Sequence, residues 1–322
     1  MRPEISVLMT IHNDFSLFPI ALNSLKIQKC ENWELLILDN SDNNPDSWNI
    51  IMQQVLIDSR IKAWKSPGYN GALSVGWPKG ASILLEKAEG EYVTFLSADD
   101  FLDESAFLFI HECINKERPD VIWVGNTFVE HVDNTFRLLD YTIPDYHVFK
   151  DDKLFEVYYV LNNTYFNSMF HYIRRDFMEE NKINFFEPYY ADYVSMTAAL
   201  AYAKKTVTLD QAVYHLTRNT SQTMGAYTYG FYDKFGKQWE IMRNLLLKEQ
   251  CQDPELFHYV LYRIYRNFNS NYQLMLSGAP CRDDYMNPIP VTENLIKEQM
   301  IGMAHNENVM EMLDLLKEID SN

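Results

Sequence analysis

The stretch "GEYVTFLSADDFLDES" spans residues 90–105 and runs from an apolar segment into a cluster of acids. Residues 92–96 are aromatic, β-branched or aliphatic, and this composition predicts a buried β-strand. Two adjacent carboxylates, Asp99 and Asp100, follow where that strand ends. Carboxylates at the carboxyl end of a strand are well placed to hold a metal ion or a nucleotide. Ser97 stands two positions before Asp99, where a paired metal-binding acid is often found.

Buried strands and helices alternate on both sides of this segment. Strands are predicted at 4–11, 33–42, 61–66, 91–96 and 120–126, and helices at 16–28, 46–58, 68–90 after a glycine-rich loop, and 103–117. This alternation favours a mainly parallel sheet with helices on both faces. Ligands bind such sheets at the carboxyl ends of the strands.

Polar clusters follow three of the predicted strands. They are His12-Asn13, Asp39-Asn40-Ser41, and Ser97 with Asp99 and Asp100. Polar residues end most strands, so one cluster would mean little. Three clusters at strand ends that share one rim favour a binding site.

The sequence pattern changes at about residue 127 and again at about residue 230. Residues 127–225 are aromatic and irregular, and they predict antiparallel strands and loops, with a strand running into a helix at 167–180 and a helix starting near Asp192. From about residue 230 apolar residues recur at helical spacing, ending in a last helix near 291–318. We therefore expect a catalytic domain at 1–225 and a helical region at 226–322.

Composition narrows the classes of function. The chain has 322 residues, 47% of them hydrophobic, and a net charge of −17. Disorder is thereby disfavoured, and so is binding along a nucleic-acid backbone, which needs clustered Lys and Arg. The four cysteines are scattered, with no zinc spacing. We expect no transmembrane helix and no secretory signal, and the scattered cysteines fit a reducing compartment.

The blocks "ISVLMTIHND", "WELLILDNSD", "GEYVTFLSADD" and "ADYVSM" occur in this order over residues 4–217. Together they resemble the GT-A glycosyltransferases of the large inverting family 2. The resemblance implies a GT-A fold, a mostly parallel central sheet flanked by helices, here with a C-terminal helical extension. It also implies transfer of a sugar from a nucleotide-activated donor, usually UDP-linked, to an acceptor hydroxyl during glycan or cell-surface polysaccharide assembly. This use implies an enzyme in the cytoplasm or peripheral at the inner membrane.

The resemblance also assigns the first donor contacts. In the family, backbone after the first strand and an acid after the second bind the base and ribose. The matching residues are Thr10, His12 and Asp39, and Asn40 stands where a second acid is common. Lys79 lies in the glycine-rich segment, where the family often has an arginine; it either contacts a phosphate or is a solvated surface lysine.

The diphosphate implies a divalent cation, Mn²⁺ or Mg²⁺, as cofactor. Asp99 matches the last acid of the family's Asp-x-Asp motif, and Ser97 and Ala98 take the preceding positions beside the donor. Asp100 is then either a supporting partner or a helix cap. His215 matches a histidine near the metal or diphosphate, although an alignment shifted by two residues selects Thr217, and a purely structural histidine is a further alternative.

The general base of the family is the aspartate of a Glu-Asp pair that opens a helix. Asp192 has that place, with Ala191 where glutamate is usual. Asp192 could instead only cap its helix, and Glu187 is the fallback base. His171 and the pair Arg174-Arg175 are candidates to line the acceptor cleft.

Two other classes of function remain open at this point. The substitutions Ser97 and Ala191 fit a degenerate, non-catalytic nucleotide-sugar-binding protein, and an α/β nucleotide fold also fits a nucleotidyltransferase. The acceptor implied by the resemblance is a glycan, a lipid-linked molecule or a protein. The helical region would orient the acceptor, cover the cleft or form a homo-oligomer.

Overall fold

The computed structural model describes residues 2–13, 15–41, 45–68, 76–133, 135–164, 171–184, 192–218, 226–283 and 288–320. The side chains at positions 45, 192, 193 and 320 lie outside that description.

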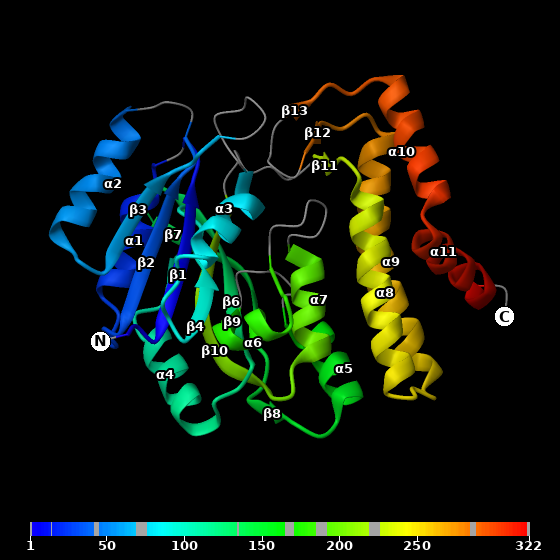
Figure 1. Ribbon diagram of the computed structural model, residues 1–322, viewed down its shortest axis with the longest axis horizontal. Helices are drawn as coiled ribbons and strands as arrows, with labels where there is room; N and C mark the ends of the chain where they lie inside the picture. Colours follow the sequence, from blue (N-terminus) through cyan, green and yellow to red (C-terminus); the bar gives the residue numbers. More distant parts are fainter. Residues whose placement is uncertain are drawn as a thin grey trace.

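Within these residues a ten-stranded mixed sheet forms the centre of the molecule (Figure 1). Its main order is β3 (Ile61–Lys65), β2 (Trp33–Asp39), β1 (Ile5–Ile11), β4 (Tyr92–Phe95), β9 (His171–Arg174), β6 (Val121–Val132), β10 (Thr206–Arg218) and β5 (Phe101–Leu102). β7 (Thr135–Thr142) pairs with β6, and β8 (His147–Phe149) pairs with β10. The first four strands are parallel, β9 enters antiparallel, and β6 and β10 are parallel to each other. The expected sheet class is confirmed.

The sheet is covered on both faces because strands such as β1 and β2 are apolar at successive positions. Val7 and Met9 pack into one buried cluster, which also contains side chains of α1 (Phe18–Lys26), α2 (Pro45–Ile57) and α4 (Ala106–Glu117). Leu8 points the other way, into a cluster with α3 (Gly76–Leu85), α5 (Lys153–Asn163), α6 (Arg175–Glu180) and α7 (Asp192–Tyr202). Alternate side chains of a strand face opposite sides, so a doubly covered strand has no polar stripe.

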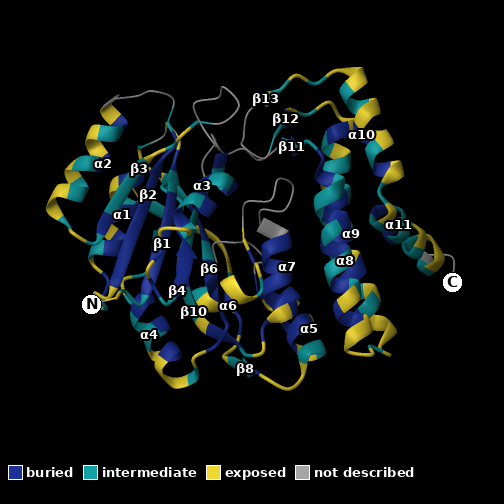
Figure 2. Ribbon diagram, viewed as in Figure 1, coloured by how far each residue is buried: buried dark blue, intermediate teal, exposed yellow. Residues whose placement is uncertain are grey.

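The C-terminal part is helical, with α8 (Phe231–Lys248), α9 (Pro254–Leu276), α10 (Glu293–His305) and α11 (Glu307–Asp320). Short strands β11 (Tyr227–Thr228), β12 (Cys281–Arg282) and β13 (Pro288–Ile289) form a second small sheet at one end of these helices (Figure 1). Trp239 of α8 belongs to the same buried cluster as Met196 of α7, and Gln238 Nε2 donates to Thr197 Oγ1 at 3.0 Å. The helices are therefore packed onto the α/β region through one continuous apolar cluster. Much of α7, which lies between the sheet and these helices, is coloured as buried in Figure 2.

Three local predictions were wrong. Residues 153–163, expected to be irregular, form α5, because Val157, Val160 and Leu161 bury one face and Asp152 caps the first turn through Phe155 N at 2.9 Å. β6 runs six residues beyond its expected end, because it continues into a hairpin with β7. The one helix predicted near 291–318 is divided into α10 and α11. Asn306 follows the end of α10, and its Oδ1 accepts a hydrogen bond from Val309 N in α11.

Among the described helices, none is both long and apolar enough to cross a membrane.

Candidate functional site

The carboxyl ends of β2, β1 and β4 lie side by side and form the rim of the candidate site. Backbone hydrogen bonds carry the alignment past the strands: Asn40 N donates to Ile11 O at 2.8 Å, and Leu96 N donates to Leu8 O at 3.1 Å. The polar clusters after these strands therefore meet at one edge, as the sequence indicates.

Asp39 holds a fixed carboxylate at the end of β2. Its side chain is buried; Ser41 N donates to one oxygen at 3.1 Å and Ser47 Oγ donates to the other at 3.4 Å. Asn40 is buried beside it, whereas His12, after β1, is exposed. This end of the rim combines an oriented carboxylate acceptor with an exposed histidine, and a carboxylate is a strong acceptor for hydroxyl groups.

The first turns of α3 sit directly over β1 and β2. A Cβ at Gly80 would lie 2.7 Å from Thr10 Cγ2 and 3.1 Å from Leu38 Cδ2, so only glycine allows the helix to come this close. Lys79, the preceding residue, is half-buried at the same end of the helix. The structure thus brings Thr10 and Lys79 to the rim, where the amino end of a helix favours negative charge.

Asp100 is turned into the protein and is only 3% exposed. Tyr214 Oη donates to its Oδ2 at 2.6 Å, Thr217 N donates to its Oδ1 at 2.7 Å, and the Ser97 side chain makes a further hydrogen bond. Burial, helped by the charge of Asp99, raises the pKa of Asp100 to about 7, although these three hydrogen bonds act in the opposite direction. The loop after β4 is in this way tied to β10.

Asp99 keeps a partly exposed position in the same loop, as do Ser97 and Ala98. Ser97 N also donates to Tyr214 Oη at 3.3 Å, so Ser97 contributes to the anchor of the loop. Of the two adjacent acids, Asp99 is the one that reaches the rim. The roles of Tyr214 and Ser97 in this anchor were not indicated by the sequence.

His215 has a defined orientation on β10. Its Nδ1 lies 2.7 Å from Thr127 Oγ1, and its ring stacks on Phe101 with centroids 4.6 Å apart. Burial lowers the pKa of His215, which keeps the imidazole neutral at neutral pH. Among the described residues, the hydrogen bond of the His215 ring involves Nδ1. Thr217, the alternative in the alignment, contributes its backbone N–H to Asp100 instead.

The predicted base lies at the edge of what the structure describes. α7 begins at Asp192, but the side chain of Asp192 and residues 185–191, with Glu187 and Ala191, lie outside the described residues.

The expected acceptor-cleft residues are not brought to the rim. Arg174 pairs with Asp120 at 2.9 Å, and Arg175 Nε donates to Gly90 O at 2.9 Å, both at the amino end of β4. That edge is opposite to the rim, because the site lies at the carboxyl end of β4. His171 is fully buried, with its ring 5.6 Å from that of Trp123. The prediction that these three residues line an acceptor cleft at the rim was wrong, because core packing or contacts at the opposite edge engage their side chains. Arg175 instead borders a separate cavity of about 500 Å³.

The donor set at the rim fits Mg²⁺ or Mn²⁺ when a diphosphate is present. Within the described part of the chain there is no group of three or more His, Cys, Asp or Glu side chains that could hold a metal by itself. Both ions keep waters and phosphate oxygens as ligands, so one carboxylate, that of Asp99, is compatible with such a site. Asp100 is not suited to be a second ligand, because its oxygens accept hydrogen bonds from the protein.

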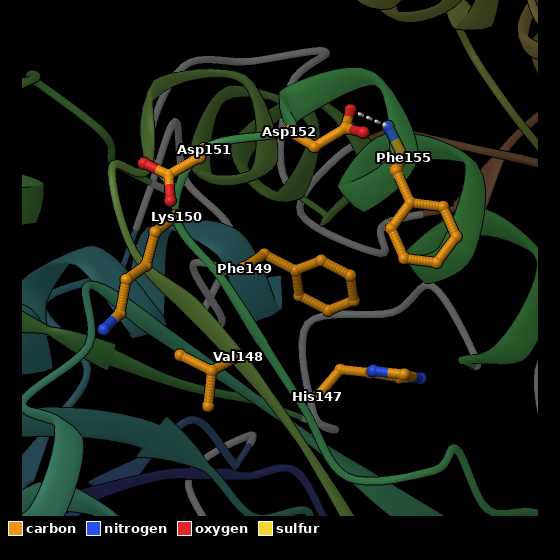
Figure 3. A pocket seen from close by; sticks show the side chains of 7 residues that line it. All are labelled: His147, Val148, Phe149, Lys150, Asp151, Asp152 and Phe155. Carbon is orange, nitrogen blue, oxygen red and sulfur yellow. Dashed lines mark hydrogen bonds between the residues drawn. The ribbon is translucent and has the colours of Figure 1, made fainter.

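Two adjoining cavities lie elsewhere. One, of about 340 Å³, is lined by β8 and the start of α5 (Figure 3), and the other, of about 630 Å³, lies between α5 and the start of α9. β8 pairs with the first residues of β10, so both cavities are at the edge opposite to the rim. They share Asp152 and Phe155 but none of the strand-end residues.

Comparison with known proteins agrees with this geometry. The family model described as "Glycosyl transferase family 2" matches residues 6–191. A Campylobacter jejuni protein described as GalNAc(5)-diNAcBac-PP-undecaprenol beta-1,3-glucosyltransferase is 25% identical over 281 residues, 85% of this chain and 86% of the relative. An uncharacterized glycosyltransferase of Haemophilus influenzae is 32% identical over 100 residues, 31% of this chain and 38% of the relative.

Among solved structures, S. aureus TarS in complex with UDP-GlcNAc superposes with a TM-score of 0.59 at 19% identity, over 84% of this chain and 73% of that one. At this identity the likeness shows the fold alone.

Proposed function

The chain belongs to glycosyl transferase family 2 and is a glycosyltransferase, and from this premise we propose that it transfers a sugar from a UDP-linked donor to an acceptor hydroxyl with inversion at the anomeric carbon. One observation carries most of the weight. The oriented carboxylate of Asp39 and the loop that bears Asp99 flank β1 at the same edge of the sheet. This spacing suits a ligand with a nucleoside at one end and a diphosphate at the other.

The nucleoside would lie against the ends of β1 and β2. Asp39 accepts hydrogen bonds from ribose hydroxyls or a base N–H, because its two oxygens are already fixed by Ser41 and Ser47. Thr10, His12 and Asn40 complete that surface. A fixed acceptor loses little entropy when it binds, so this end supplies affinity and orientation.

The diphosphate would lie between the start of α3 and the loop after β4. Lys79 and the amino end of α3 supply positive potential there. A divalent ion bound through Asp99 would offset the negative charge that develops on the leaving diphosphate. The loop that carries Asp99 is fixed by the hydrogen bonds of Asp100 with Tyr214 and Thr217. The Asp99 carboxylate is therefore already positioned to bind the metal ion.

Asp192 would accept the proton of the attacking hydroxyl. It is the first residue of α7, whose buried face packs on α8, so the helix start has a rigid support. Attack opposite to the leaving diphosphate gives inversion. His215, neutral and stacked on Phe101, offers Nε2 to the donor or metal side of the site.

The acceptor we propose is a lipid-linked glycan. The Campylobacter jejuni relative, which aligns along most of both chains, is described by name as acting on an undecaprenol-linked saccharide. We carry that acceptor class to this chain because the alignment extends beyond the donor-binding half.

The test is sugar transfer by the purified chain. UDP-glucose, UDP-GlcNAc and UDP-GalNAc are incubated with Mn²⁺, with and without chelator, and UDP release is measured with and without an undecaprenyl-diphosphate-linked saccharide. We expect release from at least one donor, its loss on chelation, and a fall of about 10²-fold or more in Asp192→Ala. Asp210→Ala, an exposed acid on β10, is the matched control. UDP binding with no turnover of any donor would contradict the proposal and favour a non-catalytic sugar-nucleotide-binding protein.

A further inference from the structure

The hairpin formed by β6 and β7 extends beyond the rim of the sheet. Val129 of β6 lies opposite Thr217 of β10, whose backbone N–H binds Asp100. His131 and Val132 of β6 therefore extend beyond the level of the acid loop, and among the described residues they pair only with β7. The hairpin is in this way an arm beside the candidate site.

The two faces of this arm differ in chemistry. Residues opposite each other in a ladder point to the same face. One face carries the pairs His131–Phe136, Val129–Leu138 and Thr127–Tyr141, and the other carries Val132–Thr135, Glu130–Arg137 and Phe128–Asp140. The arm is thus amphipathic, with one apolar and aromatic face and one mainly charged face.

The apolar face continues into the candidate site. The ring of Phe136 lies 4.6 Å from that of Phe101, and Phe101 stacks on His215 at 4.6 Å. His131 extends the row, with its ring 4.9 Å from Phe136. Phe101 follows Asp99 by two residues, so a molecule that covers this face also reaches the reaction site.

The β7 side of this face is open to solvent, whereas Val129 of β6 is buried. Leu138 is 57% exposed and Tyr141 is 62% exposed, and the neighbouring Leu139 and Ile143 are also exposed. Contiguous exposed apolar side chains mark interaction sites. The side chains of Val129, Phe136 and Leu138 have no hydrogen-bonding group, which favours hydrocarbon over a sugar as the molecule that covers them.

We propose that the apolar face of the β6–β7 arm, formed by Phe136, Leu138 and Tyr141, docks on lipid and presents the site to the lipid-linked acceptor. This inference rests on the proposed function for the identity of the acceptor. The apolar part of such an acceptor lies in a bilayer, so an apolar arm beside the site brings the two together.

A second copy of the chain fits this arm less well. β7 carries a bulge, because Leu139 has no partner at the register shift between Phe128 and Val129. A bulge on an edge strand twists the edge and opposes regular pairing with another strand. In addition, two copies that each carry a net charge of −17 repel one another.

The experiment is co-sedimentation with vesicles of phosphatidylethanolamine and phosphatidylcholine in equal parts. We expect the wild-type chain to sediment with the vesicles, and the double variant Leu138→Asp, Tyr141→Asp to bind about tenfold more weakly or worse, since burial of these side chains drives the contact. Tyr262→Asp, at an exposed tyrosine on α9, is the matched control and should bind as wild type does. Added phosphatidylglycerol should weaken binding, because the chain is acidic.

Three results would overturn the inference. They are no sedimentation of the wild type, sedimentation that the double variant leaves unchanged, and a wild-type dimer in light scattering that the double variant converts to monomer. Measuring UDP release in the absence of acceptor tests the proposed function without the docking surface, so the two claims can fail separately. A chain that sediments through this arm but never releases UDP would refute the enzyme mechanism and leave the docking surface standing.

Discussion

Asp99 and Asp100 are neighbours in the chain, yet the structure gives their carboxylates opposite surroundings. Asp100 points inward to Tyr214 and the backbone of Thr217, while Asp99 stays partly exposed at the rim. Strand-end chemistry is enough to single out Asp39 and Asp99 from the sequence. Tyr214 and Thr217 could not be found that way, because they lie 114 and 117 residues from Asp100 and meet it only in the folded chain.

Substitutions at Asp99 and Asp100 should have different effects on metal binding and on stability. Asp99→Asn should abolish binding of Mn²⁺ in the presence of UDP, as followed by electron paramagnetic resonance, with little change in thermal stability. Asp100→Asn should lower thermal stability, because the amide donates where Tyr214 and Thr217 also donate. Equal loss of Mn²⁺ binding in the two variants, with both remaining as stable as wild type, would contradict this division of roles.

Tyr214→Phe tests the anchor and carries a pH dependence. Removal of the hydroxyl should lower the unfolding free energy by about 1 kcal/mol. The pKa of Asp100 is raised from 3.8 to about 7, so the folded chain holds this proton more tightly than the unfolded chain does, and the stability due to Asp100 falls as pH rises from about 4 to about 7.

The Tyr214 hydroxyl lowers that pKa because it stabilises the ionised form. The destabilisation by Tyr214→Phe should therefore be larger at about pH 8 than at about pH 5. Urea unfolding of the metal-free protein at both pH values measures it, with Tyr262→Phe as the exposed control. The same loss at both values would show that the hydroxyl does not act on an ionised Asp100.

At the scale of elements, the parallel strands were predictable because a short, uninterrupted apolar run bounded by polar residues is typical of a strand buried on both faces. α5 was not, because its tyrosines and phenylalanine disguise a helical spacing whose buried members are Val157, Val160 and Leu161. Antiparallel strands were expected after residue 127, but the position and exposed face of the β6–β7 arm were not. Its exposed Leu138 and Tyr141 face away from any core, so a pattern based on burial does not apply to them.

The packing of α3 on β1 gives an expectation at this scale. Gly80→Ala should lower the unfolding free energy by about 1–3 kcal/mol, because the added methyl group would meet Thr10 at 2.7 Å. It should also weaken UDP binding, since α3 and Thr10 both border the rim. Calorimetry of unfolding and of UDP binding measures the two effects. Wild-type stability in this variant would show that α3 does not approach β1 so closely.

At the scale of the whole molecule, the helices after residue 225 share a core with the α/β region. Trp239 and Met242 of α8 belong to the same buried cluster as Met196 and Leu200 of α7. The division into 1–225 and 226–322 remains a prediction drawn from the change in sequence pattern. The helical periodicity of the sequence could not show that the two parts have a common core. It identifies the apolar face of each helix but not the element against which that face packs.

This shared core should make unfolding cooperative. We expect one calorimetric transition for the full chain, and a chain cut after residue 225 should aggregate or melt at a lower temperature, because the apolar face of α7 loses its cover. Two well-separated transitions, with the first 225 residues as stable alone as in the full chain, would show that the helices form an independent domain.

A structure of the chain with bound UDP and Mn²⁺ tests the proposed roles of the rim residues together. A crystal of the chain soaked with UDP and Mn²⁺ should show, in the manganese anomalous signal, an ion bound by Asp99 and by diphosphate oxygens, with the nucleoside against Asp39 and the Asp100 carboxylate still on Tyr214. UDP bound elsewhere, or a manganese ion held by Asp100 while Asp99 makes no contact with it, would contradict the proposed site.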